Sequence, residues 1–143
     1  MRPSEQADAL ARLCDEFRVD ILYVFGGRAG EVREWLAGEH SRLSPGPADV
    51  DVGVKAIAGT RLSVRDKVRL ALALEDLMGV TRVDLVALSD ADPFLAANVI
   101  RGERLYARDT YEADEYDLYV LRRAGDLAPL ERERLGLILE ETQ

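Results

Sequence analysis

Apolar residues recur with two different periods along the chain, and these periods predict alternating helices and strands. Ser4 can cap a helix over residues 4–18. Apolar positions in this segment follow the spacing i, i+3, i+4 and i+7, which predicts that one face of the helix is buried. Residues 21–25 are all apolar and end at Gly26-Gly27, which predicts a buried strand followed by a sharp turn. Residues 49–55 alternate Asp-Val-Asp-Val-Gly-Val-Lys, so this strand should present valines on one face and aspartates on the other.

The remaining segments extend this alternation to the end of the chain. Residues 38–48 are rich in glycine, proline and polar residues, which predicts a loop. The order of elements predicts an α/β (α+β) fold, with a small mixed sheet flanked by helices, in a single domain over residues 1–143. The further elements that the periods predict are helices over 28–37, 63–78, 93–100 and 109–141, the last interrupted near Gly125 and Pro129, and strands over 83–88 and 103–107.

Composition and charge narrow the range of functions. The chain has 143 residues, of which 48% are hydrophobic and 32% charged, so a packed core is expected. The net charge of −8 disfavours polynucleotide binding, because an acidic surface repels phosphates. Cys14, the single cysteine, cannot form an internal disulfide and is expected in the core. The polar N-terminus and the lack of an apolar run near the ~20 residues that span a bilayer predict a cytoplasmic protein without membrane contact.

Three aspartates are the candidate metal ligands. Asp49 and Asp51 lie two residues apart on a predicted strand, so their carboxylates should project from one face and repel each other unless a cation neutralises them. Mg²⁺ is the expected cation, because it prefers oxygen ligands and substrate phosphates. Asp84 lies within the apolar run 83–86, where a carboxylate is expected to be paired, hydrogen-bonded or bound to metal. The alternative for the Asp49–Asp51 pair is a solvated strand end.

A phosphate site is predicted beside these carboxylates. Gly26 and Gly27 stand between a strand and a helix, where glycines let backbone N–H groups approach a phosphate and the helix N-terminus favours negative charge. Arg28 could pair with a phosphate, or it could be an ordinary surface arginine. Two Mg²⁺ ions about 4 Å apart, held by the aspartates, could then clamp a triphosphate for in-line displacement. Asp84 could also accept the proton of the attacking hydroxyl.

The order Phe25-Gly26-Gly27, Asp49-Val50-Asp51-Val52 and Val83-Asp84-Leu85 resembles the DNA polymerase β-type nucleotidyltransferase superfamily. Within it, the chain is similar to the minimal nucleotidyltransferases, antitoxin-type proteins that pair with HEPN-domain toxins. The resemblance spans roughly residues 15 to 120. It implies Mg²⁺-dependent transfer of AMP from ATP to a hydroxyl, which in the antitoxin group belongs to a tyrosine of the partner toxin. The chain departs from the pattern at Gly27, where minimal members usually have serine, and in the long segment of 21 residues between Gly27 and Asp49.

Two other functions remain open at this stage. One is a binding module that kept the fold and neutralises a partner by contact alone, which the departures at Gly27 and in the long segment favour. The other is an adenylyltransferase for small molecules, which usually requires an added helical domain for which this chain has little room.

Several further residues have competing interpretations. His40 is expected in an exposed loop, and Trp35 in the core rather than stacked on an adenine. The four late tyrosines are expected to pack the last helix on the sheet or to form a partner surface, because tyrosine favours interfaces. These are Tyr106, Tyr111, Tyr116 and Tyr119.

Overall fold

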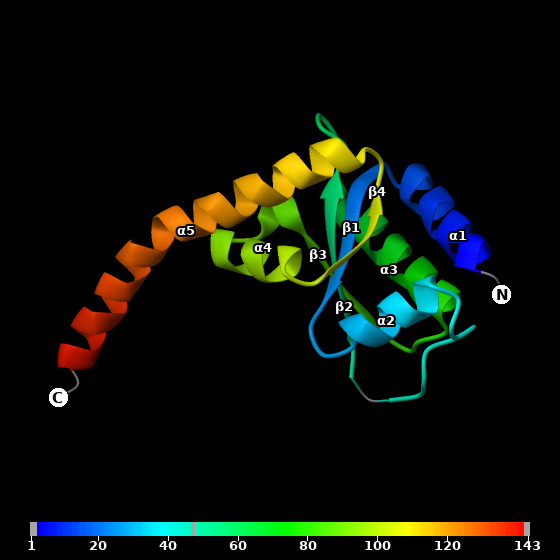
Figure 1. Ribbon diagram of the computed structural model, residues 1–143, viewed down its shortest axis with the longest axis horizontal. Helices are drawn as coiled ribbons and strands as arrows, with labels where there is room; N and C mark the ends of the chain where they lie inside the picture. Colours follow the sequence, from blue (N-terminus) through cyan, green and yellow to red (C-terminus); the bar gives the residue numbers. More distant parts are fainter. Residues whose placement is uncertain (1–2, 47, 142–143) are drawn as a thin grey trace.

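A computed structural model describes residues 3–46 and 48–141, and its architecture is the predicted α/β fold. The chain alternates between helices and strands and forms one four-stranded mixed sheet (Figure 1). The elements are α1 (Pro3–Glu16), β1 (Val19–Phe25), α2 (Ala29–Leu36), β2 (Val50–Ala56), α3 (Val64–Met78), β3 (Val83–Ala87), the 3₁₀ turn η1 (Leu88–Asp90), α4 (Pro93–Ile100), β4 (Glu103–Ala107) and α5 (Thr110–Glu141).

The strand order β3-β2-β1-β4 places the most apolar strand inside the sheet. β1 pairs antiparallel with both β2 and β4, whereas β2 and β3 run parallel. Six of the seven β1 residues are buried, because helices cover both faces of this strand. The continuous apolar run that predicted a buried strand is explained by this central position.

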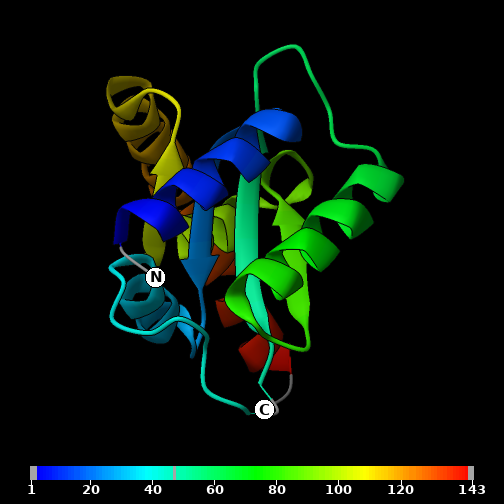
Figure 2. The same cartoon turned by 90° about the vertical axis from the view of Figure 1, so that its right-hand side faces the viewer.

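Two apolar cores lie on opposite faces of the sheet. On one face, the β2 valines Val50, Val52 and Val54 pack with buried residues of α1, α2 and α3. Figure 2 shows α1 and α3 side by side over this face. On the other face, Ile21 and Tyr23 of β1 pack with α4 and α5. The predicted separation of the valines from the aspartate side of β2 is therefore confirmed, since Asp51 is only half-buried and outside the valine core.

The ends of α3 and α4 follow the predicted capping chemistry. The Ser63 hydroxyl accepts a hydrogen bond from the Asp66 backbone N–H at 3.1 Å, and Gly79 ends α3 with a φ of 73°. Asp92 caps α4 in the same way, with Pro93 at the first helical position. The predicted cap at Ser4 is wrong, because α1 already includes that residue.

The predicted interruption of the last helix is also wrong. α5 runs without a break from Thr110 to Glu141, past Gly125 and Pro129 (Figure 1). A proline removes one N–H donor and crowds the preceding turn, which bends a helix without necessarily ending it.

The start of α5 is fixed to the sheet by polar contacts. The buried Tyr23 hydroxyl donates a hydrogen bond to the Asp117 carboxylate, and Arg104 of β4 donates to Asp117 at 3.0 Å. Arg104 also pairs with Asp114 at 2.9 Å. Burial and the neighbouring Asp117 carboxylate raise the pKa of Tyr23 above its ordinary value, so its proton stays in place for this contact. These contacts join α5 to β1 and β4.

Burial decides two further predictions. Burial raises the pKa of the Cys14 thiol to about 12, which agrees with a core cysteine and not with a reactive one. Trp35 is completely buried, so its ring packs in the core and cannot stack on an adenine in this structure. Among the described residues, none of the helices combines the length and the apolar character that a membrane crossing requires.

Candidate functional site

The candidate site lies at one end of the strands, where β1 ends and β2 and β3 begin. The register aligns Phe25 of β1 with Asp51 of β2, and Asp51 in turn with Asp84 of β3. Asp51 and Asp84 are direct partners in a parallel pair, so their side chains project from the same face. Asp49 directly precedes β2, two residues before Asp51. Asp51, Asp84 and the preceding Asp49 therefore lie at the same end of the sheet, beside the turn that follows β1.

Asp51 is the central carboxylate of this group. Burial raises the pKa of Asp51, and the negative charges of Asp84 and Asp49 raise it further. No hydrogen bond or ion pair to Asp51 or Asp84 is found among residues 3–46 and 48–141. Asp49 has one ion pair, 3.4 Å from its Oδ2 to Nε of the largely exposed Arg82. Negative charge is therefore concentrated at this end of the sheet, and the Arg82–Asp49 ion pair is the only one that compensates it among the described residues.

Gly26 and Gly27 have different roles in the turn after β1. Gly26 has a φ of +78°, and a Cβ atom added there would lie 2.5 Å from Oδ2 of Asp51. The positive φ favours glycine at position 26, and a Cβ there would displace the Asp51 carboxylate. The backbone of this turn therefore lies directly against that carboxylate. Gly27 has no positive φ, and a Cβ there would meet nothing within 4 Å.

Asp84 is exposed, so burial does not require a partner for this carboxylate, contrary to what its position within the apolar run 83–86 had suggested. The sequence places it among valines and leucine, but β3 is an edge strand with a partner on one side only. An apolar run suggests a buried strand, but whether the strand is buried depends on its position in the sheet. The sequence of the run does not give that position. The exposed carboxylate is nevertheless directly beside Asp51.

Arg28 is bound to its own chain and does not reach into solvent as a free cation. Its Nη2 donates to the Ser44 carbonyl at 2.6 Å, and its Nη1 donates to the Ala48 carbonyl at 3.2 Å. Glu31 pairs with the same guanidinium at 3.2 Å and also accepts from the Ser44 hydroxyl at 2.7 Å. Hydrogen bonds from Arg28 and Ser44 lower the pKa of Glu31 to about 2. Arg28 therefore fixes the segment that leads into Asp49, a contact that sequence reasoning did not find.

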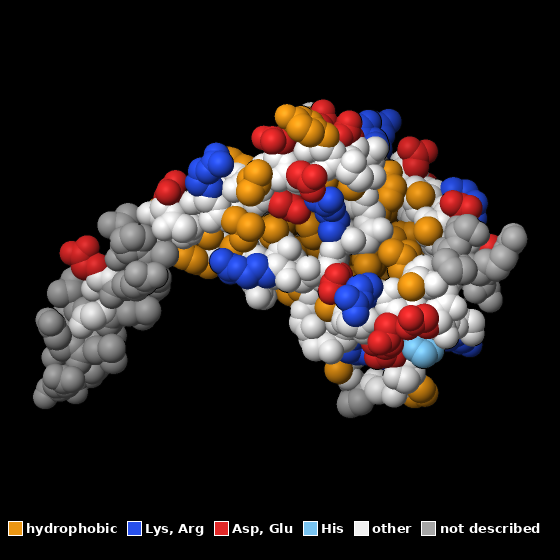
Figure 3. All heavy atoms as spheres, in the orientation of Figure 1, with side chains coloured by type: hydrophobic (Ala, Val, Ile, Leu, Met, Phe, Trp, Pro, Cys, Tyr) orange, Lys and Arg blue, Asp and Glu red, His pale blue; other side chains and the backbone are white. Residues whose placement is uncertain are grey.

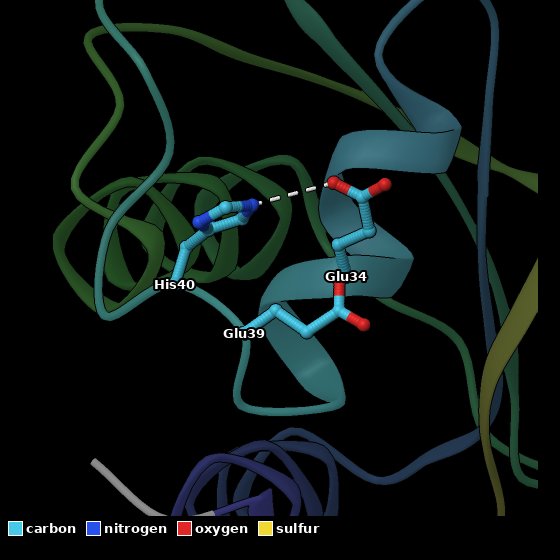
Figure 4. Close-up of side chains that lie close together, drawn as sticks. All are labelled: Glu34, Glu39 and His40. Atoms are coloured by element: carbon cyan, nitrogen blue, oxygen red, sulfur yellow. Dashed lines mark hydrogen bonds and ion pairs between the residues drawn. The ribbon is translucent and has the colours of Figure 1, made fainter.

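A second acidic group lies on α2 and the loop after it. One potential ligand atom each from Glu34, Glu39 and His40 lies within 4.8 Å of the others, and this is the closest such group in the described part of the chain. Figure 4 shows the His40 ring turned towards the Glu34 carboxylate, at 3.3 Å from Nε2 to Oε2. His40 is exposed as predicted, although the sequence did not indicate its partner. The three site aspartates are spread more widely than this group.

No protein-family model matches the sequence, and no curated protein matches it either. Solved structures do match. A toxin–antitoxin complex with AMP-PNP contains a chain with a TM-score of 0.67 and 18% identity, over 96% of this chain and 98% of the other.

Two further structures extend this comparison. A complex of tri-AMPylated Shewanella oneidensis HEPN toxin with an MNT antitoxin gives a TM-score of 0.64 and 17% identity over 99% of both chains. A protein described as a candidate minimal nucleotidyltransferase gives 0.51 and 28% identity, over 72% of this chain and 94% of the other. This chain therefore has the nucleotidyltransferase-like fold of the structures of minimal nucleotidyltransferases and their toxin–antitoxin complexes. The resemblance seen in the motifs is confirmed at the level of the fold.

Proposed function

We propose that the protein is a minimal nucleotidyltransferase that transfers AMP from ATP to a hydroxyl of a HEPN-type partner, and so acts as an antitoxin. The observation that carries this proposal is the position of Asp51. Its carboxylate lies against the backbone of Gly26 and beside Asp49 and Asp84. The turn that would bind phosphate and the carboxylates that would bind metal lie at the same end of the sheet. The solved complexes with AMP-PNP and with an AMPylated toxin support the choice of substrate and partner.

The donor set fits magnesium. Asp51 is partly desolvated and faces two like charges, an arrangement that a divalent cation relieves. Asp49, Asp51 and Asp84 offer only carboxylate oxygens, which are the ligands that Mg²⁺ prefers. When bound, two Mg²⁺ ions would neutralise the phosphate oxygens and the charge that develops during displacement.

The chain's own residues would serve the transfer in distinct ways. The backbone of Gly26 and Gly27, with the N-terminus of α2, would hold the β- and γ-phosphates. Asp84, being exposed, can face the acceptor and take the proton of its hydroxyl. The hydroxyl oxygen then bonds to the α-phosphorus, the bond from that phosphorus to the bridging oxygen breaks, and pyrophosphate leaves. Arg28 would contribute to nucleotide binding indirectly, because its guanidinium holds the segment before Asp49 through the Ser44 and Ala48 carbonyls. It would contact a phosphate directly only if ATP displaced these two carbonyls.

The partner surface that we propose lies on α5. Tyr111 and Tyr119 are 72% and 55% exposed, and Leu118 is 53% exposed. Figure 3 shows hydrophobic side chains at the surface of this helix among acidic ones. The two other tyrosines are used internally, because Tyr106 and Tyr116 pack against the two cores. Exposed tyrosine and leucine on one helix are typical of protein interfaces.

Transfer of label tests the enzymatic proposal. The protein, a co-expressed HEPN partner, Mg²⁺ and ATP labelled at the α-phosphate should give a labelled partner and free pyrophosphate. EDTA or Asp51→Asn should prevent labelling. ATP labelled at the γ-phosphate is the matched control and should leave the partner unlabelled. Absence of label with the wild-type protein would contradict the proposal.

A contact-only antitoxin is the second candidate, and one observation favours it. The Arg28 guanidinium is engaged by Glu31, Ser44 and Ala48, so the cation expected for phosphate is already occupied. A toxicity assay separates the two functions. Neutralisation by Asp49→Ala equal to that of wild type, together with no label transfer, would establish contact alone.

A further inference from the structure

A cavity lies at the end of the sheet opposite the aspartates. Its volume is about 300 Å³, and it is formed where α1 ends, β2 ends and the loop to α3 begins. Figure 2 shows this loop and the end of α1 at the end of the sheet away from the segment between α2 and β2. Asp51 and Ala56 are five residues apart on β2, which separates the two sites by about 16 Å. This cavity therefore does not belong to the site already described.

The walls of the cavity combine an apolar surface with cations. Phe17, Ala56 and Leu62 supply apolar surface, and Leu62 is itself buried in the core. Arg69 is stacked over the Phe17 ring, with its guanidinium carbon 5.4 Å from the ring centroid. Five of the nine lining residues are charged, so the apolar surface is a patch within a largely polar wall. A volume of about 300 Å³ is at the lower limit for small-molecule sites.

The charges of the lining are not balanced. Three arginines and two carboxylates line the cavity, so one negative charge would bring it to neutrality. Arg61 pairs with Asp90 at 3.2 Å, and Arg69 pairs with Asp66 at 3.5 Å. The Arg18 guanidinium makes no ion pair with any described residue. Arg18 and Glu16, both exposed, are thus the two lining charges without an ion pair among the described residues.

The backbone holds Arg18 at this position. Its φ is +56°, which no other described non-glycine residue adopts, and this left-handed conformation costs about 1–2 kcal/mol. The Arg18 N–H donates to the Asp15 carbonyl at 3.2 Å, and its carbonyl accepts from the Ile57 N–H at 2.9 Å. The arginine is therefore tied both to α1 and to the loop that forms the other side of the cavity.

We propose that this cavity binds a small organic monocarboxylate with an apolar or aromatic body. The carboxylate would pair with the Arg18 guanidinium, and the apolar body would lie against Phe17, Ala56 and Leu62. The single net positive charge of the lining selects a monoanion over a phosphate dianion. This inference does not depend on the proposed transfer reaction.

Benzoate is the probe that tests the proposal, with benzamide as the uncharged control of the same shape. In an NMR titration of the whole chain, benzoate should shift the amide signals of Arg18, Ile57 and Thr60, and benzamide should not. Equal binding of benzamide would show an apolar cavity only and overturn the proposal, as would no binding of benzoate. Tighter binding of phenyl phosphate than of benzoate would overturn the assignment to a monoanion.

Two variants assign the effect to the guanidinium. Arg18→Gln should weaken benzoate binding about tenfold, the value of one charge-assisted hydrogen bond. Arg18→Gly should weaken it equally, and its fold is secure because glycine adopts a positive φ without strain. Arg122→Gln, which removes an exposed arginine on α5, is the matched control and should leave binding unchanged. Unchanged binding in both Arg18 variants would overturn the proposal.

Discussion

Two aspartates on neighbouring strands of the sheet have opposite surroundings. Asp20, at the start of β1, is only 7% exposed and lies 3.2 Å from Lys55 Nζ and 3.4 Å from Arg108 Nε. Asp51, on β2 near the other end, faces Asp49 and Asp84 and has no cationic partner among the described residues. The protein neutralises one carboxylate with its own side chains and leaves the charge of the other uncompensated. A carboxylate of the first kind supports the fold, whereas one of the second kind is available for chemistry.

The largest expected effect comes from removing the uncompensated charge. Asp51→Asn should lower the rate of AMP transfer on the order of 10³-fold, because a lost metal ligand costs several kcal/mol of transition-state stabilisation. Circular dichroism should show an unchanged fold. Transfer at the wild-type rate would mean that Asp51 is not a metal ligand.

Removing the Asp20 carboxylate, whose charge is compensated, should lower stability and leave AMP transfer unchanged. Asp20→Ala leaves Lys55 and Arg108 without their carboxylate, and it should lower the free energy of unfolding by about 2–3 kcal/mol. This value lies below that of a fully buried pair, because the Lys55 side chain is 25% exposed. Urea denaturation measures it. The transfer rate per folded molecule should stay unchanged, and a large loss of transfer would contradict the separation of the two carboxylates.

The Arg28–Glu31 contact allows a test by pH. The folded-state pKa of Glu31 is lowered to about 2, so its contribution to stability is present above its unfolded pKa of about 4.5 and is lost as the pH falls towards 2. Glu31→Gln should therefore cost about 1–3 kcal/mol near pH 7 and almost nothing near pH 2. Thermal unfolding of both proteins across this range gives the difference. A difference that does not change with pH would exclude the ion pair as its source.

The smallest effect concerns stability without metal. Burial and like charges raise the pKa of Asp51, so its ionised form destabilises the fold at pH values above that pKa. In EDTA, Asp51→Asn should therefore raise Tm by a few degrees near pH 7. The gain should shrink as the pH falls through the folded-state pKa and be absent below the pKa of the unfolded chain. Mg²⁺ should raise the Tm of the wild type and not that of the variant. A lower Tm for Asp51→Asn in EDTA would show that the carboxylate is structural.

Local patterns predicted the elements, and long-range contacts decided the rest. The Asp-Val alternation of β2 shows which face each side chain takes, because strand periodicity is a property of the backbone. It could not show that β3 lies at the edge of the sheet, and so the exposure of Asp84 was missed. Arg28 donates to the carbonyls of Ser44 and Ala48, which are 16 and 20 residues away in the sequence. Local sequence patterns cannot predict contacts at this separation. The cavity beside Arg18 is likewise formed by segments that are separate in the sequence.

The glycine turn determines how the site could change by single substitutions. A Cβ at position 26 would press on Asp51, whereas a Cβ at position 27 would meet nothing within 4 Å and Gly27 has no positive φ. Gly27→Ser is therefore sterically permitted, and it would install the hydroxyl that minimal members of the superfamily usually carry here. Position 26 is constrained by its backbone conformation and by Asp51, whereas position 27 can accept a side chain without a change in the sheet.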